Sequence, residues 1–237
     1  MQERTIEYSC GGTSLRGKVF LPDAASSGAV PGVLVAHDWG GCNANAHGHA
    51  KALAELGYVG FAIDMYGDGR VVEALEDKAR LMGEVKSDRG VLIARMQAAL
   101  TTLKELPEVD VARTGAIGFC FGGGCVLDLA RSGADVGGVV SFHGLLDPPP
   151  AELCKAITAK VLVCHGYRDP LAKPEAMVAL CEALDTADCD FQVHVYGRTV
   201  HSFTNTLVNN VAGGSAYHPD SARRALRSMR EFFADLF

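Results

Sequence analysis

The feature that most constrains this chain is a cysteine flanked by glycines, placed between an apolar stretch and a helical one. Residues 114–131 run Thr-Gly-Ala-Ile-Gly-Phe-Cys-Phe-Gly-Gly-Gly-Cys-Val-Leu-Asp-Leu-Ala-Arg. Cys120 stands between Gly118 and Gly122, which is the cysteine form of the G-x-S-x-G turn that raises a nucleophile above the end of a sheet. Such a tight turn leaves no room for side chains two residues before and after the nucleophile. We therefore expect a strand, a sharp turn at Cys120 and a helix.

Short apolar runs alternate with helical periodicity along the rest of the chain. Apolar runs of about four to eight residues are typical of strands buried on both faces of a parallel sheet. The alternation predicts an α/β fold with a doubly wound, mostly parallel sheet of about eight strands flanked by helices. A hairpin is expected at about 4–10 and 14–20, further strands at 32–36, 58–63, 136–142, 160–165 and 190–196, and helices at about 45–56, 72–85, 88–106, 174–185 and from Pro219 onward.

Length and composition limit the class of protein. The 237 residues contain no stretch resembling a linker, so we expect a single domain over residues 1–237. A formal net charge of -6 with no run of basic residues argues against a nucleic-acid partner. The N-terminus lacks an apolar signal region and no later segment is apolar enough to cross a membrane, so we expect a cytoplasmic protein without a membrane partner. This composition favours small-molecule chemistry.

The sequence offers little support for a metal or a cofactor. Eight cysteines without a C-x-x-C pair, in a chain of this length, are expected to be reduced thiols rather than disulfides or zinc ligands. His47 and His49 point apart at the start of a predicted helix and are more typical of a solvated face than of a metal site. The glycines at 122–124 match neither of the nucleotide-binding glycine motifs. We expect no metal and no cofactor.

Polar residues follow the predicted strands at their carboxyl ends, where open α/β sheets bind ligands. Asp169 and His201 each stand in the loop after a strand, and the chain order nucleophile, acid, base is that of the α/β-hydrolases. A thiol with a pKa near ~8.5 is only slightly ionised at neutral pH, so Cys120 needs a base. His201 would supply it, and Asp169 would orient the imidazole. Each residue taken singly has a structural alternative. Cys120 could be a buried structural thiol, His201 a histidine with its hydrogen bonds satisfied, and Asp169 a surface residue.

The loop after the predicted strand 32–36 carries three further candidates. The backbone N–H groups of Phe121 and Trp39 are expected to bind a developing oxyanion. Asp38 is a candidate acid, with a helix N-cap or a turn former as an equally good alternative. Trp39, the only tryptophan, lies either in the core or, as we favour, in a pocket wall.

The chain resembles the dienelactone hydrolase family over nearly its whole length. The resemblance implies an α/β-hydrolase fold and a triad of Cys120, His201 and Asp169. It also implies hydrolysis of small esters or lactones, the carboxymethylenebutenolidase class of reaction, through an acyl-enzyme. In the family an acidic residue of the first loop takes the thiol proton; Asp38 holds that position here, in place of a longer glutamate, with His37 beside it as an alternative. The matching segments are Gly118-Phe-Cys-Phe-Gly-Gly123, Gly166-Tyr-Arg-Asp169, His201-Ser202-Phe203 and Asp64-Met-Tyr-Gly67.

The same resemblance bears on the substrate. Family members that act on dienelactone hold its carboxylate with arginines, one of them four residues after the catalytic histidine, where this chain has Asn205. We therefore expect neutral esters or lactones rather than anionic dienelactone, with uncharged phosphotriesters as a promiscuous class. The protein is expected to be a monomer or a homodimer. The alternative function is a catalytically silent fold that uses Cys120 as a redox-sensing or ligand-binding thiol. The substrate pocket is expected to include His37, Tyr66, Arg70, Phe203 and Asn205.

Overall fold

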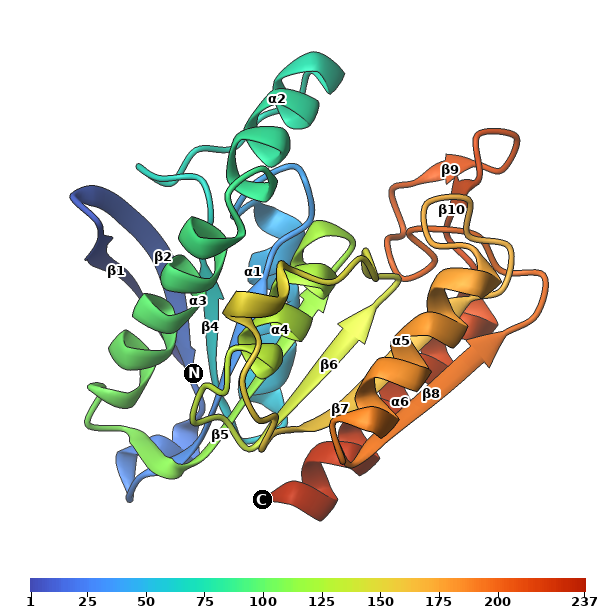
Figure 1. Cartoon of the computed structure of the whole chain (residues 1–237). Helices are drawn as coiled ribbons and strands as arrows, with labels where there is room; N and C mark the ends of the chain where they lie inside the picture. Colours follow the sequence, from blue (N-terminus) through green and yellow to red (C-terminus); the bar gives the residue numbers. More distant parts are fainter. The chain divides into compact units, whose positions relative to one another are not determined.

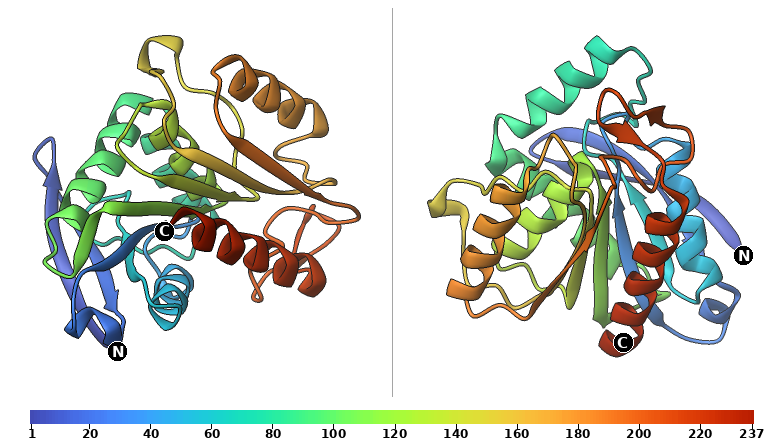
Figure 2. Two further views of the ribbon diagram at one scale, coloured as in Figure 1. Left: turned by 90° about the horizontal axis from the view of Figure 1, so that it is seen from below. Right: turned by 90° about the vertical axis from the view of Figure 1, so that its right-hand side faces the viewer.

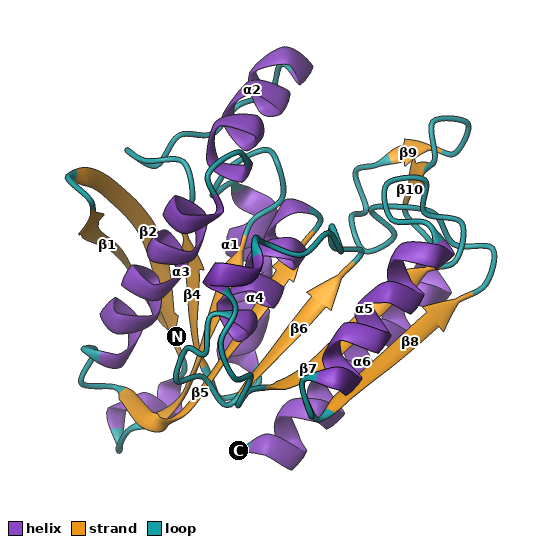
Figure 3. Ribbon diagram, viewed as in Figure 1, coloured by secondary structure: helices purple, strands orange, loops and turns teal.

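Eight strands form the main sheet and alternate with helices, so the predicted α/β class is confirmed (Figures 1 and 3). The computed structural model describes residues 1–237, and the strand order is β1-β2-β4-β3-β5-β6-β7-β8. The sheet begins antiparallel at the predicted hairpin, whereas the β3–β4, β6–β7 and β7–β8 pairs are parallel. The strands are β1 Gln2–Cys10, β2 Thr13–Leu21, β3 Val30–Ala36, β4 Val59–Ile63, β5 Val109–Phe119, β6 Gly138–Phe142, β7 Lys160–Gly166 and β8 Phe191–Tyr196.

Of the six α-helices, five stand between strands along the chain and the sixth follows the last strand. None of them combines the length and apolar character needed to cross a membrane. The chain divides into two compact units, Met1–Ile117 and Gly118–Phe237, and β5 runs from the first into the second. The single domain over 1–237 stays a prediction. The helices are α1 Ala44–Glu55, α2 Leu75–Lys86, α3 Arg89–Lys104, α4 Phe121–Arg131, α5 Pro174–Thr186 and α6 Pro219–Leu236.

In the first unit, α1 and α3 pack on opposite faces of the strands. The β3–β4 register pairs Val33 with Gly60, so these two residues face the same side of the sheet. Gly32, the neighbour of Val33 in β3, therefore faces the opposite side. A Cβ at Gly60 would lie 2.1 Å from the carbonyl oxygen of Ala50 in α1, and a Cβ at Gly32 would lie 3.1 Å from Leu103 in α3. The two glycines therefore let one helix approach each face of the strands.

In the second unit, α5 and α6 lie on opposite faces of β7 and β8 (Figure 2). α6 contacts β6 and β7 through an apolar stripe, which the helical spacing in the sequence predicted. α4 packs on β6, where a Cβ at Gly123 would lie 2.6 Å from the backbone of Gly144. This close contact fixes the helix that follows Cys120 against the strands behind it.

Two element boundaries differ from the sequence predictions, and two short strands were not predicted. β5 begins at Val109 rather than near 114, and α2 begins at Leu75 rather than at 72, because residues 67–74 form turns and loops. Two further strands of two residues each, β9 (Asn209–Asn210) and β10 (Ser215–Ala216), pair in the segment after His201. Strands this short are too brief to leave a periodic pattern in a sequence.

Candidate active site

The predicted strand, turn and helix around Cys120 are present in the structure. β5 ends at Phe119 and α4 begins at Phe121, so Cys120 is the single residue between them. Its φ is 55°, a value that residues with a side chain adopt rarely and at a cost of about 1–3 kcal/mol. A Cβ at Gly118 would lie 2.0 Å from the carbonyl oxygen of Gly122, which explains the glycine spacing. Cys120 is 8% exposed and lies at the positive end of the α4 dipole.

A buried hydrogen bond joins His201 and Asp169 within the second unit. His201 Nδ1 donates to Asp169 Oδ2 at 2.7 Å, and both residues are buried. The other carboxylate oxygen of Asp169 accepts the N–H of Leu171 at 2.9 Å. The carboxylate is thus oriented by its own loop, and it fixes the tautomer of the imidazole.

Cys120 is the second group that acts on His201. Nε2 is buried and lacks a well-formed hydrogen bond, while Cys120 lies close enough to act on the charge of the ring. Burial lowers the pKa of His201, but the hydrogen bond to Asp169 and the interactions with Cys120 and with the Asp169 charge outweigh burial and raise that pKa to about 10. The three residues that the sequence proposed as a triad are therefore brought together in the second unit.

The backbone of His201 is hydrogen-bonded to the segment that follows it in the chain. Its N–H donates to the carbonyl oxygen of Gly214, and its own carbonyl oxygen accepts the N–H of Ala216, both at 3.0 Å. Asn205 shapes the turn between them, because its Oδ1 accepts the N–H of Leu207 at 3.0 Å. The candidate base therefore has a fixed backbone on both sides.

His143, a buried histidine near Cys120, was not among the predicted site residues. His143 follows β6 directly, is 2% exposed, and lies with its ring against the ring of His201, with the centroids 5.1 Å apart. Phe203, which the sequence placed in the pocket, is fully buried and packs against His143 and Tyr196. The rule that located Asp169 and His201, a polar residue at the carboxyl end of a strand, applies equally to His143.

The remaining candidates lie in the first unit. Asp38 Oδ1 accepts the N–H of Gly40 at 2.8 Å, whereas the N-cap of α1 is Asn43, so of the two structural alternatives Asp38 forms a turn and does not cap the helix. Its second oxygen accepts from the side chain of Asn45 at 3.4 Å. Trp39 contributes its carbonyl oxygen to the hydroxyl of Tyr66 at 3.0 Å. These contacts tie the loop after β3 to the loop after β4.

His37 is fully engaged within the same unit. Nδ1 bonds the carbonyl oxygen of Asp38, and Nε2 accepts the N–H of Met65 at 3.2 Å. The ring is 1% exposed, and burial lowers its pKa. This favours Asp38 over His37 as the acid of the first loop.

The loop after β4 is organised by the carboxylate of Asp64, which is completely buried. One oxygen accepts the N–H groups of Tyr66 and Gly67, and the other accepts those of Gly69 and Arg16. Four backbone donors thus hold this carboxylate, and the carboxylate in turn fixes the shape of the loop.

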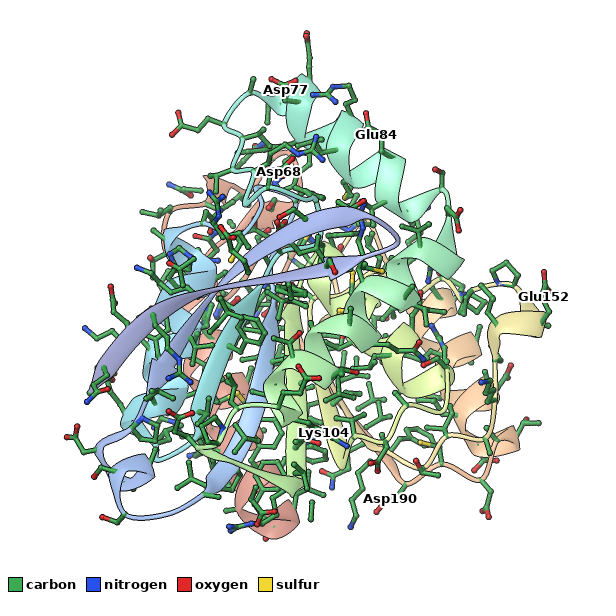
Figure 4. All side chains as sticks on the ribbon, turned by 90° about the vertical axis from the view of Figure 1, so that its left-hand side faces the viewer. Asp68, Asp77, Glu84, Lys104, Glu152 and Asp190 are labelled. Atoms are coloured by element: carbon green, nitrogen blue, oxygen red, sulfur yellow. The ribbon has the colours of Figure 1, made fainter.

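Arg70, an expected pocket residue, and Arg80, the next arginine along the chain, both have protein partners. Arg70 donates to the carbonyl oxygens of Tyr66 and Gly67 in its own loop. Arg80 pairs with Asp77 at 3.0 Å and Glu84 at 2.9 Å on the exposed side of α2, where Figure 4 labels both acids. The guanidinium of Arg80 is therefore compensated by two carboxylates.

All eight cysteines are free, and no group of three or more His, Cys, Asp or Glu side chains is arranged to hold a metal ion. Together, the sheet, the strained cysteine turn and the buried histidine–aspartate pair define an α/β-hydrolase. Residues 15–237 match the dienelactone hydrolase family. The chain belongs to this family, and it is a hydrolase acting on ester bonds.

Comparison with individual proteins agrees with this assignment. A dienelactone hydrolase-like promiscuous phosphotriesterase from metagenomic libraries superposes with a TM-score of 0.93 at 39% identity, covering 100% of this chain and 98% of the other. The structure described as m3DLH gives a TM-score of 0.94 with the same identity and coverage. An uncharacterized protein of Caenorhabditis elegans is 36% identical over 157 residues, which is 64% of this chain and 98% of the relative.

Proposed function

We propose that this protein hydrolyses small esters or lactones with Cys120 as the nucleophile. The observation that carries the proposal is the hydrogen-bonded Asp169–His201 pair facing a strained thiol at the N-terminus of α4. A raised pKa of His201 favours the imidazolium, and an adjacent imidazolium together with a helix N-terminus favours the thiolate. The site therefore suits a thiolate more than an alcohol.

The reaction follows from this charge arrangement. Cys120 Sγ attacks the carbonyl carbon, and the C=O electron pair moves onto the oxygen. Collapse of this intermediate breaks the bond to the leaving oxygen, which takes the proton of His201, and a thioester forms. Neutral His201 then takes a proton from water, the hydroxide attacks the thioester, and the thiolate departs. Asp169 stabilises the imidazolium in each half-reaction without accepting the proton.

The oxyanion is expected to bind at the start of α4. The N–H of Phe121 follows the nucleophile at the positive end of the helix, where backbone dipoles stabilise a developing negative charge. From the first unit we assign Trp39 as the second backbone donor and Asp38 as the acidic residue of the first loop. His37, Tyr66, Arg70, Phe203 and Asn205 remain the proposed pocket residues.

We expect neutral substrates to be preferred. Asn205 stands where the family's carboxylate-binding arginine would be, and Arg80 is compensated by two carboxylates. An uncharged phosphotriester places its phosphoryl oxygen where an ester places its carbonyl oxygen, and a solved relative at 39% identity is described as a promiscuous phosphotriesterase. We propose a cytoplasmic protein, monomeric or homodimeric, that needs no cofactor.

The experiment is a substrate panel on the purified protein. It ranks p-nitrophenyl acetate, a neutral δ-lactone, anionic dienelactone and a neutral phosphotriester by kcat/KM, with Cys120→Ala as the matched control. We expect turnover of the neutral carbonyl substrates and loss of that turnover in Cys120→Ala. A variant as active as the wild type would refute the cysteine mechanism, and a preference for dienelactone would refute the role given to Asn205.

A further inference from the structure

We propose that His143 is a positioning residue that links the Cys120 turn to the loop carrying His201, as a neutral imidazole protonated on Nε2. This inference rests on the proposed function, because it concerns the alignment of the same nucleophile and base. His143 comes from a third segment, the end of β6, so it joins two parts of the site that are far apart in sequence.

The first link runs from His143 to the nucleophile. The N–H of Cys120 donates to His143 Nδ1 and to the carbonyl oxygen of Phe142, both at 3.1 Å. A backbone N–H is only a donor, so Nδ1 must present its lone pair and carry no proton. The position of the strained residue is thus fixed by a side-chain acceptor in addition to a backbone carbonyl.

The second link runs from His143 to the base. With Nδ1 as the acceptor, Nε2 carries the proton and donates it to Thr204 Oγ1, which lies 2.7 Å away. Thr204 is buried and comes three residues after His201. The His143 ring also packs edge-on against the ring of His201, at an interplanar angle of 69°. One imidazole therefore holds both the loop and the ring of the candidate base.

Backbone strain supports a specific role for this residue. His143 has a φ of 39°, and Cys120, its hydrogen-bond partner, also has a positive φ. Such conformations persist where the surroundings enforce them, and they concentrate at functional sites. Here the N–H of His143 donates to the carbonyl oxygen of Cys164 at 2.9 Å, which anchors the strained residue on β7.

The test breaks the link from His143 to Thr204 with conservative variants and keeps the link from His143 to Cys120. Thr204→Val removes the hydroxyl while keeping the shape of the side chain, and Thr204→Ser keeps the hydroxyl as the matched control. His143→Asn retains an acceptor at the position of Nδ1, tolerates a positive φ, and loses the link to Thr204. Circular dichroism and urea unfolding check that each variant is folded.

We expect Thr204→Val and His143→Asn to lower kcat for p-nitrophenyl acetate about 10-fold with little change in KM, because misalignment of reacting groups slows chemistry more than binding. Thr204→Ser should stay within about 2-fold of the wild type on the same grounds. Thr204→Val and His143→Asn break the same link, the hydrogen bond between His143 and Thr204. The kcat of the double variant should therefore be no lower than that of the single variants. Additive losses, or equal losses in Thr204→Val and Thr204→Ser, would overturn the proposal.

A second readout does not depend on ester turnover. The rate of Cys120 alkylation by iodoacetamide as a function of pH reports how well His201 supports the thiolate. We expect Thr204→Val to shift this profile to higher pH and Thr204→Ser to leave it in place. An unchanged profile in Thr204→Val contradicts the role of His143, whereas a wild-type protein that alkylates normally but hydrolyses no ester contradicts the proposed function alone.

Discussion

At the scale of single residues, the chemistry depends on how two buried groups share one proton. His201 has the Asp169 carboxylate on one side and the Cys120 thiol on the other, and both favour its protonated form. An alcohol at position 120 has a far higher pKa than a thiol and gains much less from a neighbouring imidazolium. Cysteine and serine are therefore not interchangeable at this turn.

We predict that Cys120→Ser lowers kcat about 100-fold or more, which is the usual order of loss when a nucleophile is no longer matched to its base. The free energy of unfolding should change little, because the two side chains are similar in size. Steady-state kinetics and urea unfolding on the same preparations measure both quantities. Serine activity equal to that of the wild type would contradict a site built for a thiolate.

The titration of His201 provides a direct test of its partners. The imidazole should remain protonated through neutral pH and titrate at about 10 in the wild type. In Cys120→Ala we predict a lower pKa of His201, because the interaction with Cys120 is lost while burial still opposes ionisation. NMR of selectively labelled histidine follows both proteins. Identical midpoints would show that the thiol does not act on His201.

At the scale of elements, the critical feature is the contact between β5 and the first turn of α4. A methyl group at Gly118 would collide with the backbone of Gly122, which no side-chain rotation can relieve. Gly118→Ala should therefore destabilise the fold by about 1–3 kcal/mol and abolish alignment of the nucleophile.

A control for this substitution lies in α1. Gly48 is helical and exposed, and a Cβ there would meet no atom within 4 Å, so Gly48→Ala should stabilise the protein by up to about 1 kcal/mol. Urea unfolding tests whether Gly118→Ala lowers the free energy of unfolding and Gly48→Ala raises it. The explanation of the glycine spacing fails if Gly118→Ala is as stable and as active as the wild type.

The same elements explain how far sequence reasoning could go. The turn at Cys120 was predictable because it requires glycine on both sides, and the β-strands were predictable because burial on both faces demands unbroken apolar runs. β9 and β10 could not be predicted, because strands of two residues are too short to show a periodic sequence pattern. The position of His143 at the carboxyl end of β6 was predictable by the rule that located Asp169 and His201. Its role was not, because that role lies in two hydrogen bonds to distant segments, and such pairing leaves no local signature.

At the scale of the whole molecule, several imidazoles are held without charge. His37 and His165 are each 1% exposed, and burial lowers the pKa of both below the ordinary value of 6.5. His37 uses both ring nitrogens, and His165 Nε2 lies 2.7 Å from the carbonyl oxygen of Ala172 while its Nδ1 has no partner. Protonation of either ring would place a charge in the core.

This arrangement predicts that the protein loses stability as the pH falls below about 6.5. A lowered pKa in the folded state means that the unfolded chain binds more protons, so the stabilising contribution is complete above 6.5 and declines as the pH falls toward the lowered value. Each such histidine adds a slope of at most about 1.4 kcal/mol per pH unit in that range. His201, whose pKa is raised, contributes in the opposite direction as the pH falls through 6.5, and adds nothing once the unfolded chain is protonated as well, below about 5.5.

Urea unfolding between pH 7.5 and about 5, above the range where carboxylates titrate, measures the effect. We expect the free energy of unfolding of the wild type to fall once the pH is below about 6.5. His165→Gln, which keeps a donor near the carbonyl oxygen of Ala172 but cannot ionise, should flatten the curve by at most the slope of one histidine, even if it lowers stability at pH 7.5. A curve as steep as that of the wild type would mean that His165 does not contribute, because loss of packing alone shifts the curve without changing its slope.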